Sequence, residues 1–336
     1  MLSVLDQVPV FRDGSPAEAV RDSVALARSA EEYGYQRFWI AEHHGSAANA
    51  CASPEVVTAA VAAATSRIRV GSGGVLLPHY SPLKVAETFR VLSALSPGRI
   101  DLGFGRGPGG PPAMAELLNP YALRTDEAFL EQVGRLLGFL GDSRTVSRVS
   151  VTPEVPDPPV PWMLGSGAGS ARMAGMLGLP FCFAQFIAIE ELPEAIEAYR
   201  AAFRPSPWLS SPRPMLALRV LCAESDAEAE ELATCFWMSC TTGWRAQVQL
   251  TDDYRGGAPN LEDARRYRLT EEDRALRESR PFLQLSGTPA AVGKEIRRLL
   301  TVYDVPEAML TTNCPGLEAR RRSYELLATE FDLPTA

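Results

Sequence analysis

The chain has 336 residues, of which 46% are apolar and 22% charged, so it has the material for a soluble globular core in one large domain or two smaller ones. Its net charge of −8 argues against nucleic acid or an anionic membrane as the main partner. No run approaches 18 apolar residues, and residues 1–6 predict a first strand, not a signal peptide.

The six cysteines predict no metal site. They contain no C-x-x-C pair and have no histidine tract beside them, which argues against zinc. Their scatter through apolar stretches indicates reduced, buried thiols in a cytoplasmic protein.

The first third of the chain alternates short apolar segments with helical patterns. The apolar segments predict strands at 2–5, 38–41, 68–70 and 100–102. Helices are predicted at 15–33, 53–64 and 81–95, each opened by a Ser-Pro pair that supplies a cap and a first helical residue. The repeat of about 30 residues is that of βα units.

The same alternation continues to the end of the chain. Strands are predicted at 162–164, 181–184, 215–222 and 308–311, and helices at 125–140, 170–177, 190–203, 226–240, 289–303 and 317–331. Eight strands alternating with helices predict one α/β domain over 1–336, a (β/α)8 TIM barrel, with an open doubly wound sheet as the alternative.

Two irregular segments, 145–161 and 241–285, are too long for plain connectors. In a barrel they are expected as insertions that overhang the C-terminal mouth, with 241–285 as a lid. The arginine run 320–322 is expected on a solvated helix face.

Polar clusters follow the predicted strands where a barrel places its chemistry. All three histidines lie in the first 80 residues: His43 and His44 follow the second strand, and His79 follows the third. Adjacent residues on a strand face opposite ways, so one of the pair is expected to point into the mouth and the other toward a neighbouring helix. A hydrogen-bonded structural histidine is the alternative, and the absence of H-x-H or H-x-x-x-H spacing argues against a metal.

A glycine- and serine-rich run, Gly-Ser-Gly-Ala-Gly-Ser at 165–170, opens the helix after the fifth strand. Backbone N–H groups at a helix start, with the hydroxyls of Ser166 and Ser170, predict an anion site, to which Arg106 at the neighbouring strand end adds a charge. A tight βα turn is the alternative. Gly73 and Gly74 after the third strand predict a bare surface for a flat ring, or else a bulge at the rim.

These motifs together resemble the luciferase-like flavin monooxygenases, in particular the branch with tailoring enzymes of bacterial aromatic polyketide and antibiotic pathways. The resemblance is strong over the first 110 residues and looser at 164–183 and in the C-terminal helix. It is carried by Leu-Asp-Gln at 5–7, Ala-Glu-His-His at 41–44, Val-Gly-Ser-Gly-Gly at 70–74, Pro-His-Tyr-Ser-Pro at 78–82, Pro-Gly-Arg-Ile-Asp-Leu-Gly at 97–103 and Gly-Arg at 105–106.

The resemblance implies a cytoplasmic TIM-barrel enzyme, usually a homodimer, that uses reduced FMN and dioxygen to hydroxylate or epoxidise a small, aromatic polyketide-like molecule. A separate NAD(P)H:flavin reductase would supply the reduced FMN. His43 would be the catalytic histidine, and Gly73–Gly74 the non-prolyl cis peptide beneath the isoalloxazine ring. The FMN phosphate would be held by Arg106, Ser166, Gly167, Ala168 and Ser170.

One departure limits what is carried over. Bacterial luciferase has a cysteine where this chain has Gly105, so light emission from an aldehyde is not implied. A deazaflavin-dependent oxidoreductase, a non-catalytic flavin-binding subunit, and a metal-dependent hydrolase using Glu42 and the histidines stay as alternatives.

Overall fold

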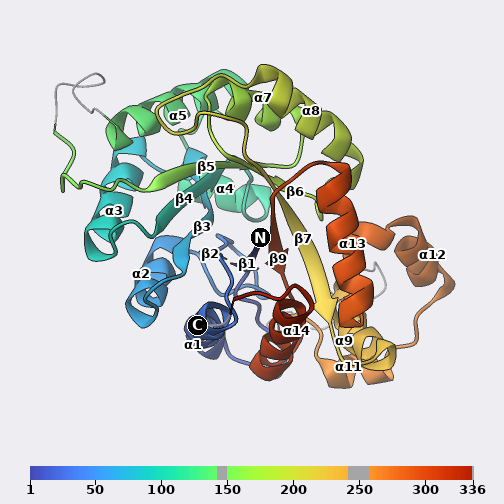
Figure 1. The fold of residues 1–336 in the computed structure, drawn as a ribbon. Coiled ribbons are helices and arrows are strands. Elements are labelled where there is room, and N and C mark those ends of the chain that lie inside the picture. Colours follow the sequence, from blue (N-terminus) through green and yellow to red (C-terminus); the bar gives the residue numbers. More distant parts are fainter. Residues whose placement is uncertain (142–149, 241–256, 335–336) are drawn as a thin grey trace.

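Eight parallel strands close into a barrel in the computed structural model, which describes residues 1–141, 150–240 and 257–334 (Figure 1). Each of the first seven strands pairs with the next, and the last closes the ring between β7 and β1. The predicted TIM barrel is therefore confirmed, and the open sheet is excluded. The barrel strands are β1 (Leu2–Asp6), β2 (Arg37–Ile40), β3 (Arg69–Leu76), β4 (Ile100–Gly105), β5 (Val160–Gly165), β6 (Phe181–Ala184), β7 (Pro214–Cys222) and β9 (Glu307–Thr311).

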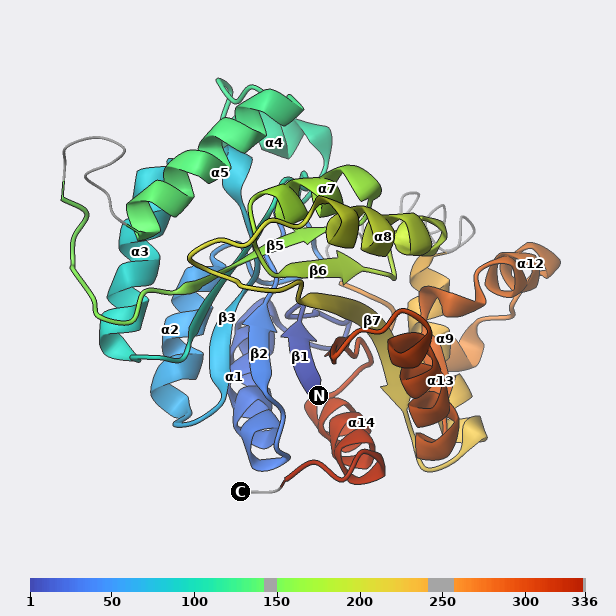
Figure 2. The same ribbon diagram turned by 45° about the horizontal axis from the view of Figure 1, so that its top comes forward.

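Helices surround the strands on the outside (Figures 1 and 2). Of the three serine caps expected, only Ser15 bonds the helix start, in a capping box with Glu18, whereas Ser53 and Ser81 make no side-chain cap bond. Thr125 caps the helix that begins at Asp126. The surrounding helices are α1 (Pro16–Glu32), α2 (Pro54–Ala64), α3 (Pro82–Leu95), α5 (Asp126–Leu140), α7 (Ala168–Met176), α8 (Leu192–Ala202), α9 (Asp226–Cys240), α13 (Pro289–Val302) and α14 (Leu317–Glu330). Within the described ranges, none of the helices is long and apolar enough to cross a bilayer.

Short elements that the sequence pattern did not predict interrupt this ring. They are η1 (Leu77–His79), α4 (Pro112–Leu118), η2 (Ile189–Glu191), α11 (Leu261–Arg266), α12 (Glu271–Ser279), η4 (Pro281–Leu283) and β8 (Leu285–Gly287). The extra strand β8 pairs with the end of β7 at Val220–Cys222, outside the barrel.

The segment expected to be a lid is only partly described, because 241–256 and, in the earlier insertion, 142–149 lie outside the described residues. Of the described part, Ala258 exchanges backbone hydrogen bonds with Val10 and Arg12 in the loop after β1. Further along, α11 and α12 stand beside α9 at the edge of the molecule (Figure 2). The lid role stays a prediction.

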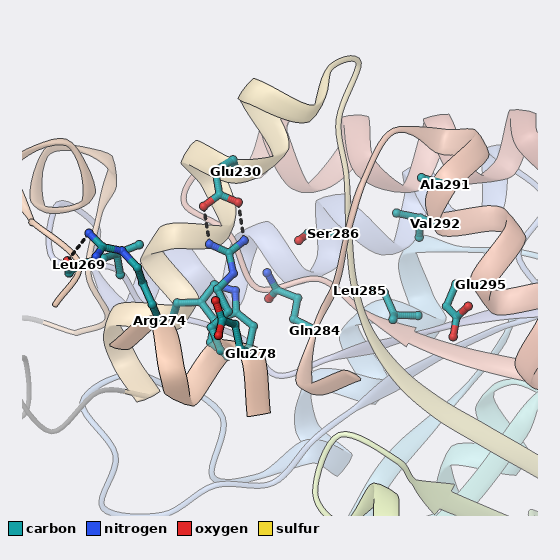
Figure 3. A pocket seen from close by; sticks show the side chains of 12 residues that line it. Glu230, Leu269, Arg274, Glu278, Gln284, Leu285, Ser286, Ala291, Val292 and Glu295 are labelled. Carbon is teal, nitrogen blue, oxygen red and sulfur yellow. Dashed lines mark hydrogen bonds and ion pairs between the residues drawn. The ribbon is translucent and has the colours of Figure 1, made fainter. Parts of the chain in front are cut away.

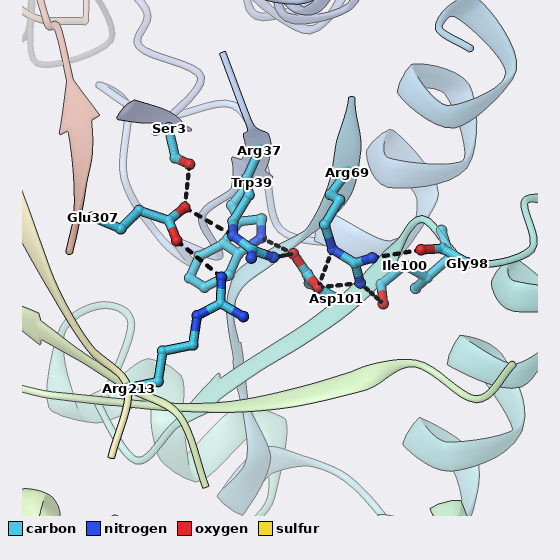
Figure 4. Close-up of polar contacts among 9 residues, drawn as sticks. All are labelled: Ser3, Arg37, Trp39, Arg69, Gly98, Ile100, Asp101, Arg213 and Glu307. Carbon is cyan, nitrogen blue, oxygen red and sulfur yellow. Dashed lines mark hydrogen bonds and ion pairs between the residues drawn. The ribbon is translucent and has the colours of Figure 1, made fainter. Parts of the chain in front are cut away.

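A buried ion-pair network fills the N-terminal end of the barrel (Figure 4). Arg37 lies at its centre, with Nη1 2.6 Å from Asp101 Oδ2 and Nε 2.8 Å from Glu307 Oε1. All three side chains are buried, so each charge is stabilised by its oppositely charged partners instead of by water. Ser3, Trp39, Arg69 and Arg213 complete the hydrogen bonds of the two carboxylates.

Above this network the barrel interior is apolar. Trp39 and Trp162 meet edge to face, with ring centroids 5.3 Å apart. Leu5, Ala41, Cys182, Met215, Ala217 and Met309 pack around them. This layer forms the floor of the C-terminal mouth.

The expectation for the arginine run at 320–322 is wrong for its first member. Arg320 is buried and its guanidinium contacts Asp6 Oδ1 at 2.5 Å, while Ser23 donates to the other oxygen of the same carboxylate. The pattern misled because position 320 falls on the face of α14 that packs toward β1, which a charge run alone does not reveal.

Five of the six cysteines are buried, and Cys240 is partly exposed. Burial raises the pKa of four of these thiols to about 12: Cys51, Cys222, Cys235 and Cys314. The pKa of Cys182 is raised further by the same cause.

Candidate active site

A cavity of about 740 Å³ opens at the C-terminal ends of the barrel strands and brings the predicted site residues together. It is lined by seven of the eight residues singled out from the sequence: His43, Gly73, Gly74, Arg106, Ser166, Gly167 and Ser170. The eighth, Ala168, is the first residue of α7 and does not line the cavity.

The two adjacent histidines face different surroundings, as expected. His43 lines the cavity, and its buried Nδ1 has no hydrogen-bond partner among the residues that the structure describes. His44 is buried, with Nε2 2.7 Å from Glu42 Oε1. His44 is therefore the structural histidine of the pair.

Glu42 fixes the segment that carries His43. Its Oε1 also accepts a hydrogen bond from the Tyr80 hydroxyl at 2.7 Å, and its Oε2 accepts one from the Leu76 backbone N–H at 3.0 Å. Tyr80 was not singled out as a site residue, although it belongs to the Pro-His-Tyr-Ser-Pro motif. The carboxylate thus ties the end of β2 to the end of the neighbouring strand β3.

Burial and the neighbouring His44 lower the pKa of His43 to about 4, so its imidazole is neutral at pH 7. The unfolded chain takes up this proton near pH 6.5, whereas the folded chain does so only near pH 4. The neutral site therefore contributes stability above pH 6.5, and this contribution is lost as the pH falls toward 4.

We expect the His43→Gln variant to lose this pH dependence. Between pH 7 and pH 5, the free energy of unfolding of the wild type should fall by about 2 kcal/mol more than that of the variant, because only the wild type must take up the proton on unfolding. Urea unfolding at both pH values measures the difference. Equal pH dependence in the two proteins would show that His43 titrates normally.

The peptide bond between Gly73 and Gly74 is cis, as the resemblance implied. A Cβ at Gly74 would lie 2.7 Å from the carbonyl oxygen of Gly103, and one at Gly73 would lie 2.6 Å from Leu5 Cδ1. Both positions therefore accept only glycine without a shift of their neighbours, and they leave the cavity a side-chain-free wall.

The helix α7 begins at the cavity, behind the glycine- and serine-rich run. The Ser170 hydroxyl donates to the Gly167 carbonyl at 2.9 Å, which holds the turn closed. No atom lies within 4 Å of where a Cβ would stand at Gly167 or Gly169. The first backbone N–H groups of α7 are thus approachable for an anion.

Arg106 is partly exposed, with 44% of its side-chain surface accessible, and its guanidinium forms an ion pair with Asp126, the first residue of α5. The sequence did not indicate this partner, because 20 residues separate the two. An anion at this place has to share Arg106 with the carboxylate or displace it.

Other lining residues come from positions without a motif. Leu164, Ala184 and Ala217 follow the inward-facing alternation along β5, β6 and β7, which strand periodicity alone identifies. Phe186 and Ile187 line the wall just after β6, and the sequence had no signal for them.

A second cavity of about 670 Å³ lies away from the mouth, between α9, α12, β8 and α13 (Figure 3). None of the predicted site residues lines it. Beside it, an ion pair of Arg277 with Glu230 joins α12 to α9. The mouth cavity, which is lined by His43 and by the start of α7, is the candidate active site.

Known proteins are similar to this chain in sequence and in fold. Residues 1–302 match the model of the luciferase-like monooxygenase family. The chain is 40% identical over 334 residues to the uncharacterized protein YceB of Bacillus subtilis (strain 168), covering 98% of this chain and 99% of that protein. It is 34% identical over 335 residues to the N-acetyl-S-alkylcysteine monooxygenase of the same bacterium, covering 97% of each. Among solved structures, apo-MsnO8 superposes with a TM-score of 0.88 at 35% identity, covering 100% of this chain and 99% of the other.

The family match, the relatives that span the whole chain and the barrel agree with one another. The chain belongs to the luciferase-like monooxygenase family, as its motifs predicted, and is a flavin-dependent monooxygenase.

Proposed function

We propose that this enzyme uses reduced FMN and dioxygen to oxygenate a small organic molecule in the mouth cavity. A separate NAD(P)H:flavin reductase supplies the reduced FMN, and the enzyme works as a homodimer in the cytoplasm. The observation that carries the proposal is that one cavity is lined by His43, by the Gly73–Gly74 wall and by the start of α7.

The residues of the cavity fit FMN. The cis Gly73–Gly74 segment offers the bare surface that a flat ring needs. The open N-terminus of α7, with Ser166, Ser170 and Arg106, offers donors and charge for a phosphate. When bound, reduced FMN supplies the electrons that activate dioxygen.

Each residue then has a defined task. His43 stays neutral at pH 7 and presents an imidazole that donates or accepts a hydrogen bond at the reacting edge. Glu42 orients that segment through His44 and Tyr80. The apolar floor of Trp39 and Met309 keeps water from the lower side of the cavity.

The substrate class proposed from the motifs is an aromatic polyketide-like molecule, hydroxylated or epoxidised. The 34% identity to the N-acetyl-S-alkylcysteine monooxygenase over almost the entire chain favours a second class, the S-alkyl thioethers, which would be oxygenated in the same cavity. A panel of both classes, incubated with FMN, a flavin reductase and NADH, and followed by mass spectrometry, distinguishes them by which members gain an oxygen atom.

The flavin itself is tested by rapid mixing. Protein with photoreduced FMN is mixed with oxygenated buffer, and the flavin absorbance is followed. Reoxidation with a time course distinct from that of free FMN is expected. Reoxidation identical to that of free FMN, both with and without the substrate panel, together with tight binding of a deazaflavin, would favour the deazaflavin-dependent alternative.

We expect Arg106→Met to weaken FMN binding by roughly 10- to 100-fold, because a charge-assisted hydrogen bond to the phosphate is lost. Riboflavin, which lacks the phosphate, should bind the variant and the wild type alike. Fluorescence titration of both flavins gives the comparison. Arg135→Met removes another exposed, ion-paired arginine, with 60% of its side-chain surface accessible, from α5 and is the control. An equal loss for FMN and riboflavin would place Arg106 at another part of the ligand.

A further inference from the structure

A second arginine faces the mouth, from the side opposite the glycine wall. Along β7, Met215 and Ala217 point into the barrel, so Arg219 is the next inward-facing position toward the mouth. Ala217 lines the cavity, as does Phe186, whose ring lies 4.7 Å from the Arg219 guanidinium carbon. Arg219 does not itself line the cavity, but it lies against Phe186 and one inward-facing position beyond Ala217, next to the cavity edge.

The guanidinium of Arg219 is held in place by aromatic rings. It is stacked between Phe186 and Phe236, the second ring at 4.4 Å. Among the described residues its one hydrogen bond runs from Nη1 to the Leu283 carbonyl, at a long 3.4 Å, and none of them accepts a hydrogen bond from its buried Nε. In the described part of the chain, no carboxylate forms an ion pair with it.

The buried arginines Arg37, Arg90 and Arg320 differ from Arg219 in having several close hydrogen-bond or ion-pair partners. Arg37 has two carboxylates, Arg320 has Asp6, and Arg90 donates to five backbone carbonyls around Val151 and Leu140. Burial without such a partner lowers the pKa of Arg219 to about 10, while nearby carboxylates raise those of Arg37 and Arg320. A protein that pairs its other buried guanidinium groups leaves this one at the mouth open to an anion.

A hydroxyl lies beside it. Thr311 is the register partner of Arg219 across β7 and β9, and its buried Oγ1 has no hydrogen-bond partner among the described residues. Parallel register partners face the same side of a sheet, so both groups project toward the mouth.

We propose that Arg219, with Thr311 beside it, binds a carboxylate of the organic substrate, so that this enzyme oxygenates organic acids. The inference rests on the proposed function, because it names the substrate class of the same cavity. The aromatic pair holds the guanidinium rigidly, and Phe186 contributes an apolar wall for the rest of the substrate. The acid group is thereby kept on the β7 side of the mouth, and the substrate body extends toward His43 and Gly73–Gly74.

The test compares acids with their amides. A panel of aromatic and thioether carboxylic acids, each paired with its primary amide, is titrated against the enzyme by calorimetry, with and without FMN. Wild-type enzyme is expected to bind the best acids roughly 10- to 100-fold more tightly than the matching amides, as a charged hydrogen bond provides. Arg219→Met should abolish this preference, Arg219→Lys should keep part of it, and Thr311→Val should reduce it.

Arg204→Met, which removes an exposed arginine, is the control and should retain the full preference. A merely structural role of Arg219 would lower affinity for acids and amides equally, and this outcome overturns the proposal. So does a wild-type enzyme that binds no acid more tightly than its amide. Riboflavin and FMN titrations on the same variants keep the two proposals separate, because Arg219→Met should leave flavin affinity unchanged even where it removes the preference for acids.

Discussion

Replacing Arg37 by methionine is expected to lower the free energy of unfolding by about 3–5 kcal/mol, the largest loss of stability we anticipate for a single side chain in this protein. The change leaves Asp101 and Glu307 buried at the N-terminal end of the barrel without their common cation. Asp101 and Glu307 are 0% and 1% exposed, so water cannot take the place of the lost cation. Urea unfolding at pH 7 measures the loss.

Arg69→Met is the matched comparison, because Arg69 also contacts Asp101 but keeps 27% of its side-chain surface exposed. A loss of about 1–2 kcal/mol is expected there, since Arg37 still neutralises the carboxylate. Equal losses in the two variants would mean that the network is held by its outer members and not by Arg37.

Replacing His43 by alanine is expected to reduce substrate oxygenation by about 10²- to 10⁴-fold, the range for removal of a group that handles a proton at the reacting centre. FMN binding should change little, because the phosphate site proposed at α7 and Arg106 lies on other strand ends. The ratio of oxygenated product to hydrogen peroxide, measured per flavin reoxidised, separates the two effects.

His79→Asn serves as the comparison for this variant. His79 hydrogen-bonds the Pro108 carbonyl and does not line the cavity. The oxygenation rate of the His79→Asn variant should therefore stay near that of the wild type. Full activity in His43→Ala would show that His43 has no part in the reaction. Glu42 and its hydrogen-bond partners would then be the candidates for handling the proton.

The barrel could be predicted from the sequence because its signals are local. Ser-Pro pairs mark the starts of α1, α2 and α3, and the run at 181–184 was predicted as a strand with the bounds that β6 has. The site followed from the barrel, since strand ends converge whatever the side chains are. That is why His43, Gly73 and Ser166 could be placed in one cavity before any contact was known.

The parts that escaped prediction depend on contacts between distant residues. Arg320 belongs to a run of three arginines, and only the packing of α14 against β1 shows that one of them is buried with Asp6. Arg106 forms its ion pair with Asp126, which is 20 residues further along the chain. Arg219 is distinguished by having no carboxylate partner among the described residues. No local pattern encodes an absent partner.

The buried cysteines have a consequence for an enzyme that handles reduced flavin and oxygen together. Such an enzyme releases hydrogen peroxide whenever oxygen oxidises the flavin without being transferred to the substrate. Peroxide reacts with thiolates far faster than with thiols. With a pKa of about 12, only roughly one Cys51, Cys222, Cys235 or Cys314 side chain in 100,000 is ionised at pH 7. The fold therefore protects these thiols from the enzyme's own by-product and needs no disulfide to do so.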